Sequence, residues 1–323
     1  MKYKLLLLSL LLYGLWTLIF TDGDKNVGGW KNGELFGGWT KQLGTSSDDL
    51  GNSITTDSSG NIYVTGETGE GLDGNKHSGK SDIFLIKYNA SGTKQWTKQL
   101  GTSSIDLGIG VTTDSSGNIY LTGFTKGGLD GNTNSRKSDI FLIKYNSSGT
   151  KQWTKQLGTS SSDWGNSVTT DSSGNIYVTG TTKGGLDGNN SSGESDIFLI
   201  KYNSSGTKQW TKQLGTTSDD WGNSVTTDSS GNIYLTGFTK GGLDGNNSSG
   251  ESDIILLKFD SSGTKQWTKQ LGTPSYESGS GVTTDSLGNI YVTGTTLGGL
   301  DGNTNFGEKD IFLIKYNSSG TIQ

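Results

Sequence analysis

The sequence repeats itself with a period of 57 residues. The tetrapeptide Gly-Asn-Ile-Tyr begins at Gly60, Gly117, Gly174, Gly231 and Gly288, and a Trp-Thr-Lys-Gln-Leu-Gly motif begins at Trp39, Trp96, Trp153, Trp210 and Trp267. The interval from Trp39 to Gln323 holds 285 residues, which is five whole periods. Self-similarity at a fixed period of this length predicts repeated units that stack or are arranged around an axis.

Each copy contains four segments that resemble β-strands. In the third copy they are 151–158, 166–170, 175–182 and 195–203, and all are rich in β-branched and aromatic residues between Gly, Asn, Asp and Ser. The last segment is almost continuously apolar, which is typical of a strand covered on both faces. No segment has a convincing helical period, so the sequence predicts an all-β fold.

Two of the connections in each copy have the composition of tight turns. In the third copy they are Asp171–Gly174 and Asn203–Gly206. Asp or Asn at the first turn position bonds the backbone two residues later, and Gly at the fourth adopts positive φ. The recurring aspartates are therefore predicted to form turns and not a ring of acids: Asp57, Asp114, Asp171, Asp228 and Asp285.

Five four-stranded units that are hydrophobic on both sides need neighbours on both sides. Radial closure supplies them, so we predict a β-propeller of five four-stranded blades, built from five repeats at 39–95, 96–152, 153–209, 210–266 and 267–323. In propellers that resemble this arrangement, the segment before the Asp-Ser-Ser-Gly turn is innermost, so we expect 166–170 to be the inner strand and 151–158 an outer strand. The small Ser, Val and Thr side chains of 166–170 suit the inner position. Trp39–Gly44 is then predicted to complete the fifth blade and to close the ring. An open stack, a fragment of a longer array, and a propeller made by two chains are the alternatives.

The repeat also resembles a known family. The motifs Trp-Thr-Lys-x-Leu-Gly, Asp-Ser-Ser-Gly-Asn-Ile-Tyr-Val-Thr-Gly, Gly-Leu-Asp-Gly and Ser-Asp-Ile-Phe-Leu-Ile-Lys-Tyr are similar to those of the bacterial beta-propeller repeat family called SBBP, over Trp39 to Gln323. The resemblance implies a propeller fold. It also implies a secreted or surface protein, and it names no ligand.

The N-terminus has the pattern of an export segment. Lys2 and Lys4 precede the apolar run Leu5–Phe20, so we expect 1–21 to be a signal peptide or a retained N-terminal anchor, followed by a Gly-rich leader at 22–38. Any membrane contact is expected only through this segment. The chain has no cysteine, which excludes disulfides and thiolate sites. Its formal net charge of −5, without a basic run, argues against nucleic acid as a partner.

The two longer connections of each copy are predicted to lie together on one face of the ring. In the third copy they are 158–167 and 181–196. Binding residues concentrate on such loops. Candidates on the first loop are the acids Asp49, Asp106, Asp163, Asp220 and Glu277, together with Trp164 and Trp221. The acids either bind a ligand or cap local backbone N–H groups. The tryptophans either stack on a ligand or pack between blades.

The second loop has oxygen-bearing side chains spaced by two residues. The speculative metal ligands are Asp187, Asn189, Asp196, Asp244, Asn246 and Asp253. Calcium favours such ligands, but the full spacing of a calcium loop is absent. We therefore expect that the protein has no cofactor, and calcium is the alternative.

Nothing in the sequence completes a catalytic set. The lone histidine, His77, lies in a variable stretch, and nearly equivalent copies offer similar environments where acid–base catalysis needs different ones. We therefore expect a non-enzymatic, secreted or cell-surface binding module with five near-equivalent loop sites for a multivalent glycan or protein. The alternatives are a structural or interaction scaffold without a small ligand, then a calcium-binding propeller or a glycan-active enzyme.

Overall fold

The computed structural model describes residues 29–31, 34–36 and 38–323. Contacts divide the chain into two units, one ending at Leu43 and one from Gly44 to Gln323. The first contains a short antiparallel hairpin, β1 (Gly29–Lys31) and β2 (Glu34–Phe36), inside the predicted Gly-rich leader. The predicted export segment, 1–21, lies outside the described residues. Among those described, no helix combines the length and the apolar character that crossing a bilayer requires.

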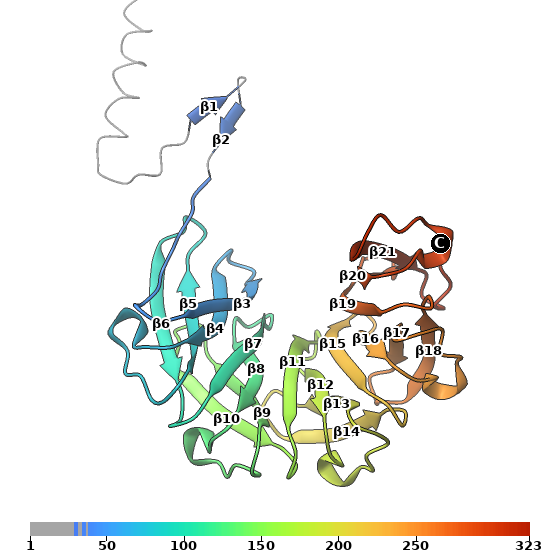
Figure 1. Ribbon diagram of the computed structural model, residues 1–323. Helices are drawn as coiled ribbons and strands as arrows, with labels where there is room; N and C mark the ends of the chain where they lie inside the picture. The colour runs from blue at the N-terminus through green and yellow to red at the C-terminus, as the bar shows by residue number, and fades with distance from the viewer. Residues whose placement is uncertain (1–28, 32–33, 37) are drawn as a thin grey trace, which may run out of the picture. The chain divides into compact units, whose positions relative to one another are not determined.

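The second unit consists of five antiparallel sheets, which we call blades 1 to 5 (Figure 1). Blades 1 to 4 each have four strands and blade 5 has three, and in every blade the strands lie side by side in chain order. The strands of blades 1 and 2 are β3 (Asp49–Thr56), β4 (Ile62–Thr68), β5 (Asp82–Tyr88), β6 (Lys94–Leu100), β7 (Asp106–Thr113), β8 (Ile119–Thr125), β9 (Asp139–Tyr145) and β10 (Lys151–Leu157). Those of blades 3 to 5 are β11 (Asp163–Thr170), β12 (Ile176–Thr182), β13 (Asp196–Tyr202), β14 (Lys208–Leu214), β15 (Asp220–Thr227), β16 (Ile233–Thr239), β17 (Asp253–Phe259), β18 (Lys265–Leu271), β19 (Glu277–Thr284), β20 (Ile290–Thr296) and β21 (Asp310–Tyr316).

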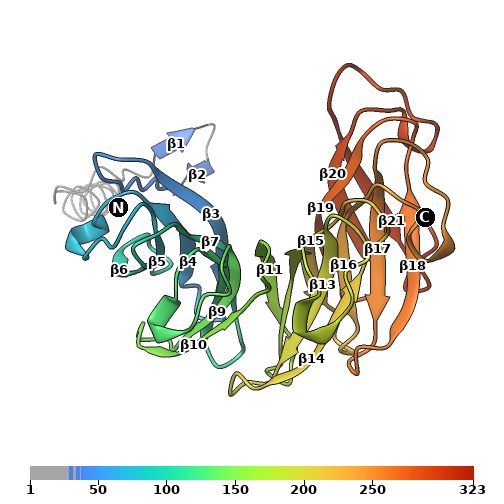
Figure 2. The same cartoon turned by 60° about the horizontal axis from the view of Figure 1, so that its bottom comes forward.

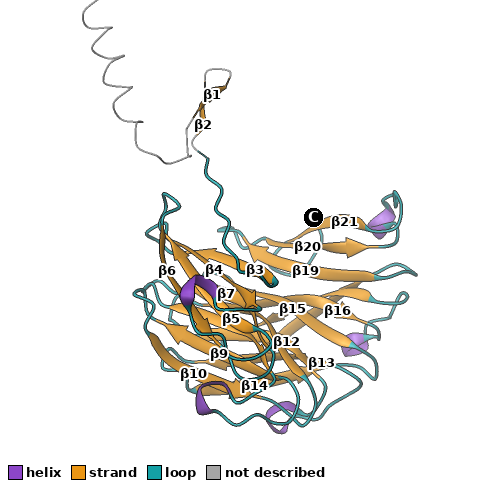
Figure 3. Ribbon diagram, turned by 60° about the vertical axis from the view of Figure 1, so that its left-hand side comes forward, coloured by secondary structure: helices purple, strands orange, loops and turns teal. Residues whose placement is uncertain are grey.

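A short 3₁₀ helix interrupts the long connection of every blade, beside the outermost strand where there is one (Figure 3). The five are η1 (Leu72–Gly74), η2 (Leu129–Gly131), η3 (Leu186–Gly188), η4 (Leu243–Gly245) and η5 (Leu300–Gly302). Each begins with a buried leucine, and its aspartate has positive φ. Asp is one of the few non-glycine residues that adopt this conformation readily, so the Leu-Asp-Gly triplet suits the tight turn.

The tight turns form as predicted from their sequence. Asp171 Oδ1 accepts hydrogen bonds from the backbone N–H groups of Ser173 and Asn175, each at 2.9 Å. Asp171 Oδ2 accepts the hydroxyl proton of the buried Tyr177, also at 2.9 Å. Gly174 closes the turn with φ of 77°. The recurring aspartate thus links the turn to the core of its blade.

The first strand of each blade begins earlier than the sequence predicted. In blade 3 the predicted segment 166–170 is preceded by Asp163, Trp164 and Gly165, all of which belong to β11. A β-bulge between Gly165 and Ser167 shifts the register against β12, so that the strand bends and then continues. The bulge breaks the alternation of side chains, which is why the sequence pattern suggested a loop.

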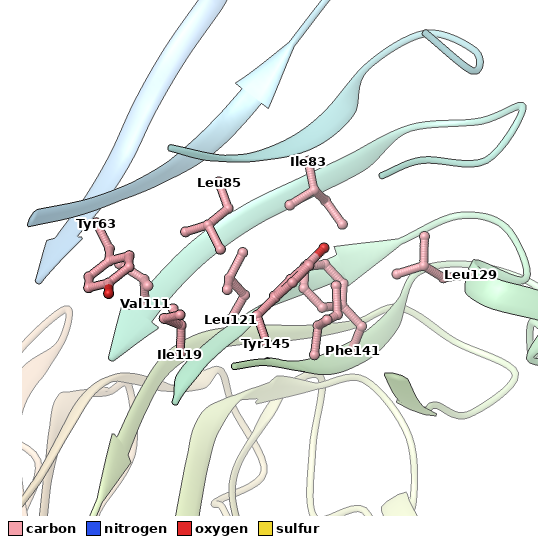
Figure 4. Close-up of a cluster of buried hydrophobic side chains, with 10 residues drawn as sticks. Tyr63, Ile83, Leu85, Val111, Ile119, Leu121, Leu129, Phe141 and Tyr145 are labelled. Carbon is pink, nitrogen blue, oxygen red and sulfur yellow. The ribbon is translucent and has the colours of Figure 1, made fainter. Parts of the chain in front are cut away.

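The hydrophobic core lies between consecutive blades. Four clusters fill the four boundaries, and Figure 4 shows the one between blades 1 and 2. There Tyr63, Ile83 and Leu85 of blade 1 face Leu121 and Phe141 of blade 2. Burying a side chain of this size contributes about 1.5–3 kcal/mol relative to leaving it exposed. The stability of each blade therefore depends on its neighbour.

The first strands lie on the inside of the arrangement. β3, β7, β11, β15 and β19 pack against one another in succession, and each of the last four also packs on the second and third strands of the preceding blade. This confirms the predicted inner position of the Ser-Val-Thr-Thr segment.

The five blades follow one another along an arc (Figures 1 and 2). Blades 1 and 5 are not among the blade pairs that pack strand against strand. Leu313 on β21 is 74% exposed, whereas its counterpart Leu256 on β17 is fully buried. At the other end Ile54 on β3 is 67% exposed, while its counterpart Val111 is 7% exposed. Both end blades therefore show an apolar face that is covered at every internal boundary.

The fourth strand predicted for blade 5 is not present in its sheet. Residues 38–48, all of which the structure describes, form no strand, and blade 5 contains β19, β20 and β21. Closure of the ring by Trp39–Gly44 thus stays a prediction, while the five-sheet, all-β architecture of the repeats is observed.

Candidate binding surface at the loop end of the blades

Both longer connections of each blade lie at one end of the sheets, which we call the loop end. In blade 3 these are 158–162, which leads into β11, and 183–195, which joins β12 to β13. The pairing of Asp163 with Thr182 and of Thr182 with Asp196 places the starts of β11 and β13 at this end. The tight turns lie at the opposite end.

The candidate acids on the first strands are held by their own loops. Asp163 is fully buried, and its Oδ2 accepts hydrogen bonds from the backbone N–H and the hydroxyl of Thr159, at 2.5 and 3.0 Å. Its Oδ1 accepts the hydroxyl proton of Thr182. These contacts are those of a carboxylate that organises the loop, the second of the two roles considered for it.

The same contacts recur at the other acids of this series. Asp106, Asp220 and Glu277 are fully buried and accept hydrogen bonds from the equivalent threonines; Asp49 accepts them from Thr45. The described residues contain no group of three or more His, Asp or Glu side chains arranged to hold a metal ion, so the acids do not converge on one another.

Burial changes the acidity of these groups. It raises the pKa of Asp163 above the ordinary value, although Thr182 and Thr159 donate hydrogen bonds that work in the opposite direction. Burial raises the pKa of Asp220 in the same way. At Asp49, in the end blade, burial also works to raise the pKa, but hydrogen bonds from Thr68 and Thr45 outweigh it and the pKa is lowered.

The residues considered as calcium ligands bind protein groups. Asp187 pairs with Lys208 and accepts a hydrogen bond of 2.7 Å from the Thr211 hydroxyl, which fastens η3 to the outer strand. Asn189 donates to the carbonyl oxygen of Leu186 at 2.8 Å. Asp244 pairs with Lys265, and Asn246 donates to Leu243, in the same manner.

The third aspartate of this group lies at the start of the third strand. Asp196 is fully buried, and its Oδ2 accepts hydrogen bonds from the Ser192 N–H at 2.8 Å and from Gln213 Nε2 at 2.6 Å. Its Oδ1 lies 1.9 Å from where a Cβ on Gly215 would be, which explains why the Trp-Thr-Lys-Gln-Leu motif ends in glycine. Asp253 has the equivalent partners Ser249, Gln270 and Gly272.

Four aromatic rings form a row across blades 3 to 5 at the loop end. Trp164 and Trp221 stack with their ring centroids 5.9 Å apart, Trp221 stacks on Phe238 at 5.8 Å, and Phe238 meets Tyr276 at 5.9 Å. Lys183 Nζ lies 5.7 Å from the centre of the Trp164 ring. Trp164, Trp221 and Tyr276 are half-buried, so the row is both an inter-blade contact and part of the surface. We call these four rings the aromatic row.

The aromatic row makes the copies unequal. The position of Trp164 and Trp221 is occupied by Leu50, Leu107 and Ser278 in blades 1, 2 and 5. The sequence did not point to Phe238 or Tyr276 as site residues. The available signal for Tyr276 was its departure from the repeat. The contact of Phe238 with Trp221 depends on the pairing of β15 with β16, and the contact of Tyr276 with Phe238 depends on the packing of blade 5 on blade 4.

The lone histidine has a local role. His77 Nε2 lies 2.7 Å from the carbonyl oxygen of Gly79, and Nδ1 lies 3.4 Å from Asp82. Both partners belong to the long connection of blade 1 and the start of β5.

The fold and its repeat define a tandem-repeat protein of β-propeller blades. A family model for the beta-propeller repeat, SBBP, matches residues 38–73, 95–130, 152–187, 209–244 and 266–301, which together make up more than half of the sequence. The chain therefore belongs to the SBBP beta-propeller repeat family. Each match ends at the Leu-Asp of a 3₁₀ turn and begins near the outer-strand tryptophan.

Two curated proteins are similar to this chain. An uncharacterized WD repeat-containing protein, L264, of Acanthamoeba polyphaga mimivirus is 26% identical over 227 residues, which is 55% of this chain and 16% of that protein. The regulatory protein FlaEY of Caulobacter vibrioides is 27% identical over 273 residues, which is 73% of this chain and 28% of that protein. The chain thus spans less than a third of the length of either relative.

Solved structures resemble the chain more distantly. A protein of unknown function from Bacteroides caccae has a TM-score of 0.42 at 9% identity, over 84% of this chain and 79% of that one. A gluconolactonase from Xanthomonas campestris has a TM-score of 0.42 at 13% identity, over 76% of this chain and 69% of that one.

Proposed function

We propose that this protein is a non-enzymatic binding module whose target contacts the loop end of blades 3 to 5. The observation that supports this proposal is the aromatic row, because half-buried Trp and Tyr side chains supply rigid, partly apolar contact area at little entropic cost and dominate many interfaces. The copies that lack it have smaller side chains at the same position. The site is therefore concentrated on three blades and is not five equal sites.

The packing of the rings favours a protein or peptide target over a sugar. Trp221 stacks with both Trp164 and Phe238, so its ring is engaged by other aromatic side chains. Stacking on a sugar needs a free ring face, and the Trp164 face beneath Lys183 becomes one only if the lysine moves. A row of buried and half-buried rings suits apolar and hydrogen-bonding side chains. A glycan target remains the second candidate, supported by that one face.

The non-catalytic part of the proposal rests on the chemistry of the described residues. Their buried acids are engaged by threonine, glutamine and backbone donors. Buried carboxylates held in this way organise the loops that they cap, which supports a non-catalytic role. The proposed location is extracellular or at the cell surface, on the strength of the N-terminal sequence pattern of Lys2, Lys4 and Leu5–Phe20.

Peptide-display and glycan-array screens with the purified chain test the proposal. We expect binding that Trp164→Ala and Trp221→Ala each weaken by roughly tenfold or more, the effect of losing about 1.4 kcal/mol or more of contact energy. Leu107→Ala, the same position in blade 2, is the matched control and should bind as the unmodified chain does. Folded structure is checked by circular dichroism. Failure to bind any peptide or glycan would contradict the proposal and favour the scaffold alternative.

Two finer predictions from the sequence can be tested beside it. If Trp39–Gly44 closes the ring, deletion of 37–45 should lower the melting temperature far more than deletion of 22–36, and equal effects would exclude closure. If calcium binds at Asp187 or its counterparts, calcium should raise the melting temperature and a chelator should lower it.

A further inference from the structure

The outer strand of a complete blade is held by its glutamine as well as by its backbone. In blade 4, Gln270 Oε1 accepts the N–H of Leu243 at 3.0 Å. Its Nε2 donates to Asp253 Oδ2 at 2.6 Å and to the carbonyl oxygen of Gly241 at 3.0 Å. The same glutamine contacts occur in blades 1, 2 and 3. One glutamine thus joins the outer strand, the long connection and the third strand.

Blade 5 has the groups to which this glutamine would bind, but its sheet lacks the outer strand that would carry the glutamine. Leu300 and Asp310 are the counterparts of Leu243 and Asp253. In the described part of the chain no glutamine side chain forms a hydrogen bond with them, and Asp310 accepts one from the Phe306 N–H at 2.7 Å. Beside β21 lies a cavity of about 340 Å³ lined by Leu300, Asp301, Asp310 and Leu313, among others. Along this edge lie a bridge between Tyr316 and Ile322 and a hydrogen bond of 3.0 Å from the Gln323 N–H to the Lys315 carbonyl. We call this the open edge of blade 5.

The open edge adjoins the apolar end face of blade 5. Ile311 is 91% exposed, whereas its counterpart Ile254 is 1% exposed against the following blade. The internal boundaries show what covers this face, because β19 packs on β15, β16 and β17. The matching surface at the other end of the arc is β3, with Ile54 exposed at the position that Val111 and Val168 bury. The two end faces are therefore complementary, because the same pair of surfaces packs together at each internal boundary.

The segment that leads into β3 carries the sequence of an outer strand. Trp39–Gly44 reads Trp-Thr-Lys-Gln-Leu-Gly, as do the outer strands of blades 1 to 4. A Cβ on Gly272 would lie 1.8 Å from Asp253 of its blade, but the nearest group to a Cβ on Gly44 is Asp49, at 3.1 Å. Gly44 therefore has room for an aspartate placed as Asp253 is placed beside Gly272. Asp310 is the counterpart of Asp253 in blade 5, whose edge is open.

We propose that the end face and open edge of blade 5 bind blade 1 and Trp39–Leu43 of a second copy of this chain. The register follows from the internal blades: Trp39 pairs with Lys315, Lys41 with Leu313, and Leu43 with Ile311, as Trp267, Lys269 and Leu271 pair with Lys258, Leu256 and Ile254. Gln42 then takes the place of Gln270. Such strand addition gains affinity from backbone hydrogen bonds and specificity from alternate side chains.

A second copy fits the arc better than closure within one chain. Blades 1 and 5 do not pack together, and bringing them into contact would change the rotation at four close-packed boundaries. Such interiors resist deformation. A second copy needs no change, because it repeats an existing boundary. Since the contact joins unlike ends, it produces a closed ring of several chains or a filament.

Light scattering across a range of protein concentrations gives the first test. We expect particles heavier than one chain, dissociating on dilution. Leu313→Asp should raise the dissociation constant by roughly tenfold or more, since it places a charge on a face that is otherwise buried. Leu287→Asp is the matched control, because Leu287 is 86% exposed on a turn of the same blade, and it should leave association unchanged. The mass of a single chain at every concentration would overturn the proposal.

Cysteine pairing distinguishes a second copy from closure within one chain, since the natural sequence has no cysteine. Chains with Lys41→Cys are mixed with chains carrying Leu313→Cys and oxidised, because side chains opposite each other on paired strands lie within disulfide reach. A mixed disulfide dimer is the expected product. Lys41→Cys mixed with Leu287→Cys is the control and should not cross-link. If only a single chain carrying both Lys41→Cys and Leu313→Cys forms the disulfide, and does so internally, the second-copy proposal is wrong and the ring closes within one chain.

Discussion

Leu256 and Leu313 provide a matched test of the open arc, because they are the same residue at the same place in consecutive blades. Leu256 is fully buried at the boundary between blades 4 and 5, whereas Leu313 is 74% exposed. Leu256→Ala should cost about 2–5 kcal/mol of unfolding free energy, the range for a leucine truncated in a packed core. Leu313→Ala should cost about 0.5 kcal/mol, because roughly a quarter of a transfer energy of about 2 kcal/mol is at stake.

The assay is urea unfolding, followed by circular dichroism, at concentrations where light scattering gives the mass of a single chain. Midpoints and slopes are compared for the unmodified chain and the two variants, since a changed slope indicates a change in the surface exposed on unfolding. The expected result is a large shift of the midpoint for Leu256→Ala and almost none for Leu313→Ala. Equal shifts in the single-chain state would refute the reasoning, since they would mean that the end face of blade 5 is covered by the chain itself.

Three further predictions concern single contacts. Asp171→Ala should lower the unfolding free energy, measured in urea, by about 2–4 kcal/mol, because it leaves a buried tyrosine hydroxyl and two turn N–H groups without their charged acceptor. Asn203→Ala, in the exposed turn, should lower it by only about 0.5–1 kcal/mol. Gly158→Ala should lower the melting temperature markedly, since its Cβ would lie 2.1 Å from Asp139, and an unchanged melting curve would contradict that contact. Because the folded-state pKa of Asp163 is raised, its contribution favours folding in acid and is lost as pH rises above its unfolded value of about 4. The stability of the unmodified chain relative to Asp163→Asn should therefore fall as the pH rises above about 4, and a rise would refute the assignment.

Much of the fold follows from local sequence. The Asp-Ser-Ser-Gly motifs predicted the tight turns, because the Asp side chain accepts hydrogen bonds from the backbone of the turn and Gly adopts positive φ, as Asp171 and Gly174 do. The inner position of the first strand followed from its small side chains. The apolar third strand predicted burial on both faces, and Ile197 and Phe198 are both fully buried.

What the sequence did not predict depends on relations between copies. The rotation from one blade to the next decides whether five blades close, and this small angle arises from packing along whole strands. The role of Asp163 depended on the bulge beside Gly165, which moves the acid from a loop into a buried strand end. The aromatic row depended on Phe238 stacking on Trp221 within blade 4 and on Tyr276 of blade 5 meeting Phe238. None of these relations can be predicted from the sequence of a single repeat.

The identical boundaries between blades bear on how such a chain changes in length. Gain or loss of one 57-residue unit, for example by unequal recombination between nearly identical coding segments, would bring together only surfaces that already fit each other. No compensating substitution would be required at the new junction. The number of units is therefore a quantity that selection can adjust freely, and the chemistry that distinguishes one unit from another, such as a tryptophan in place of a leucine, travels with the unit.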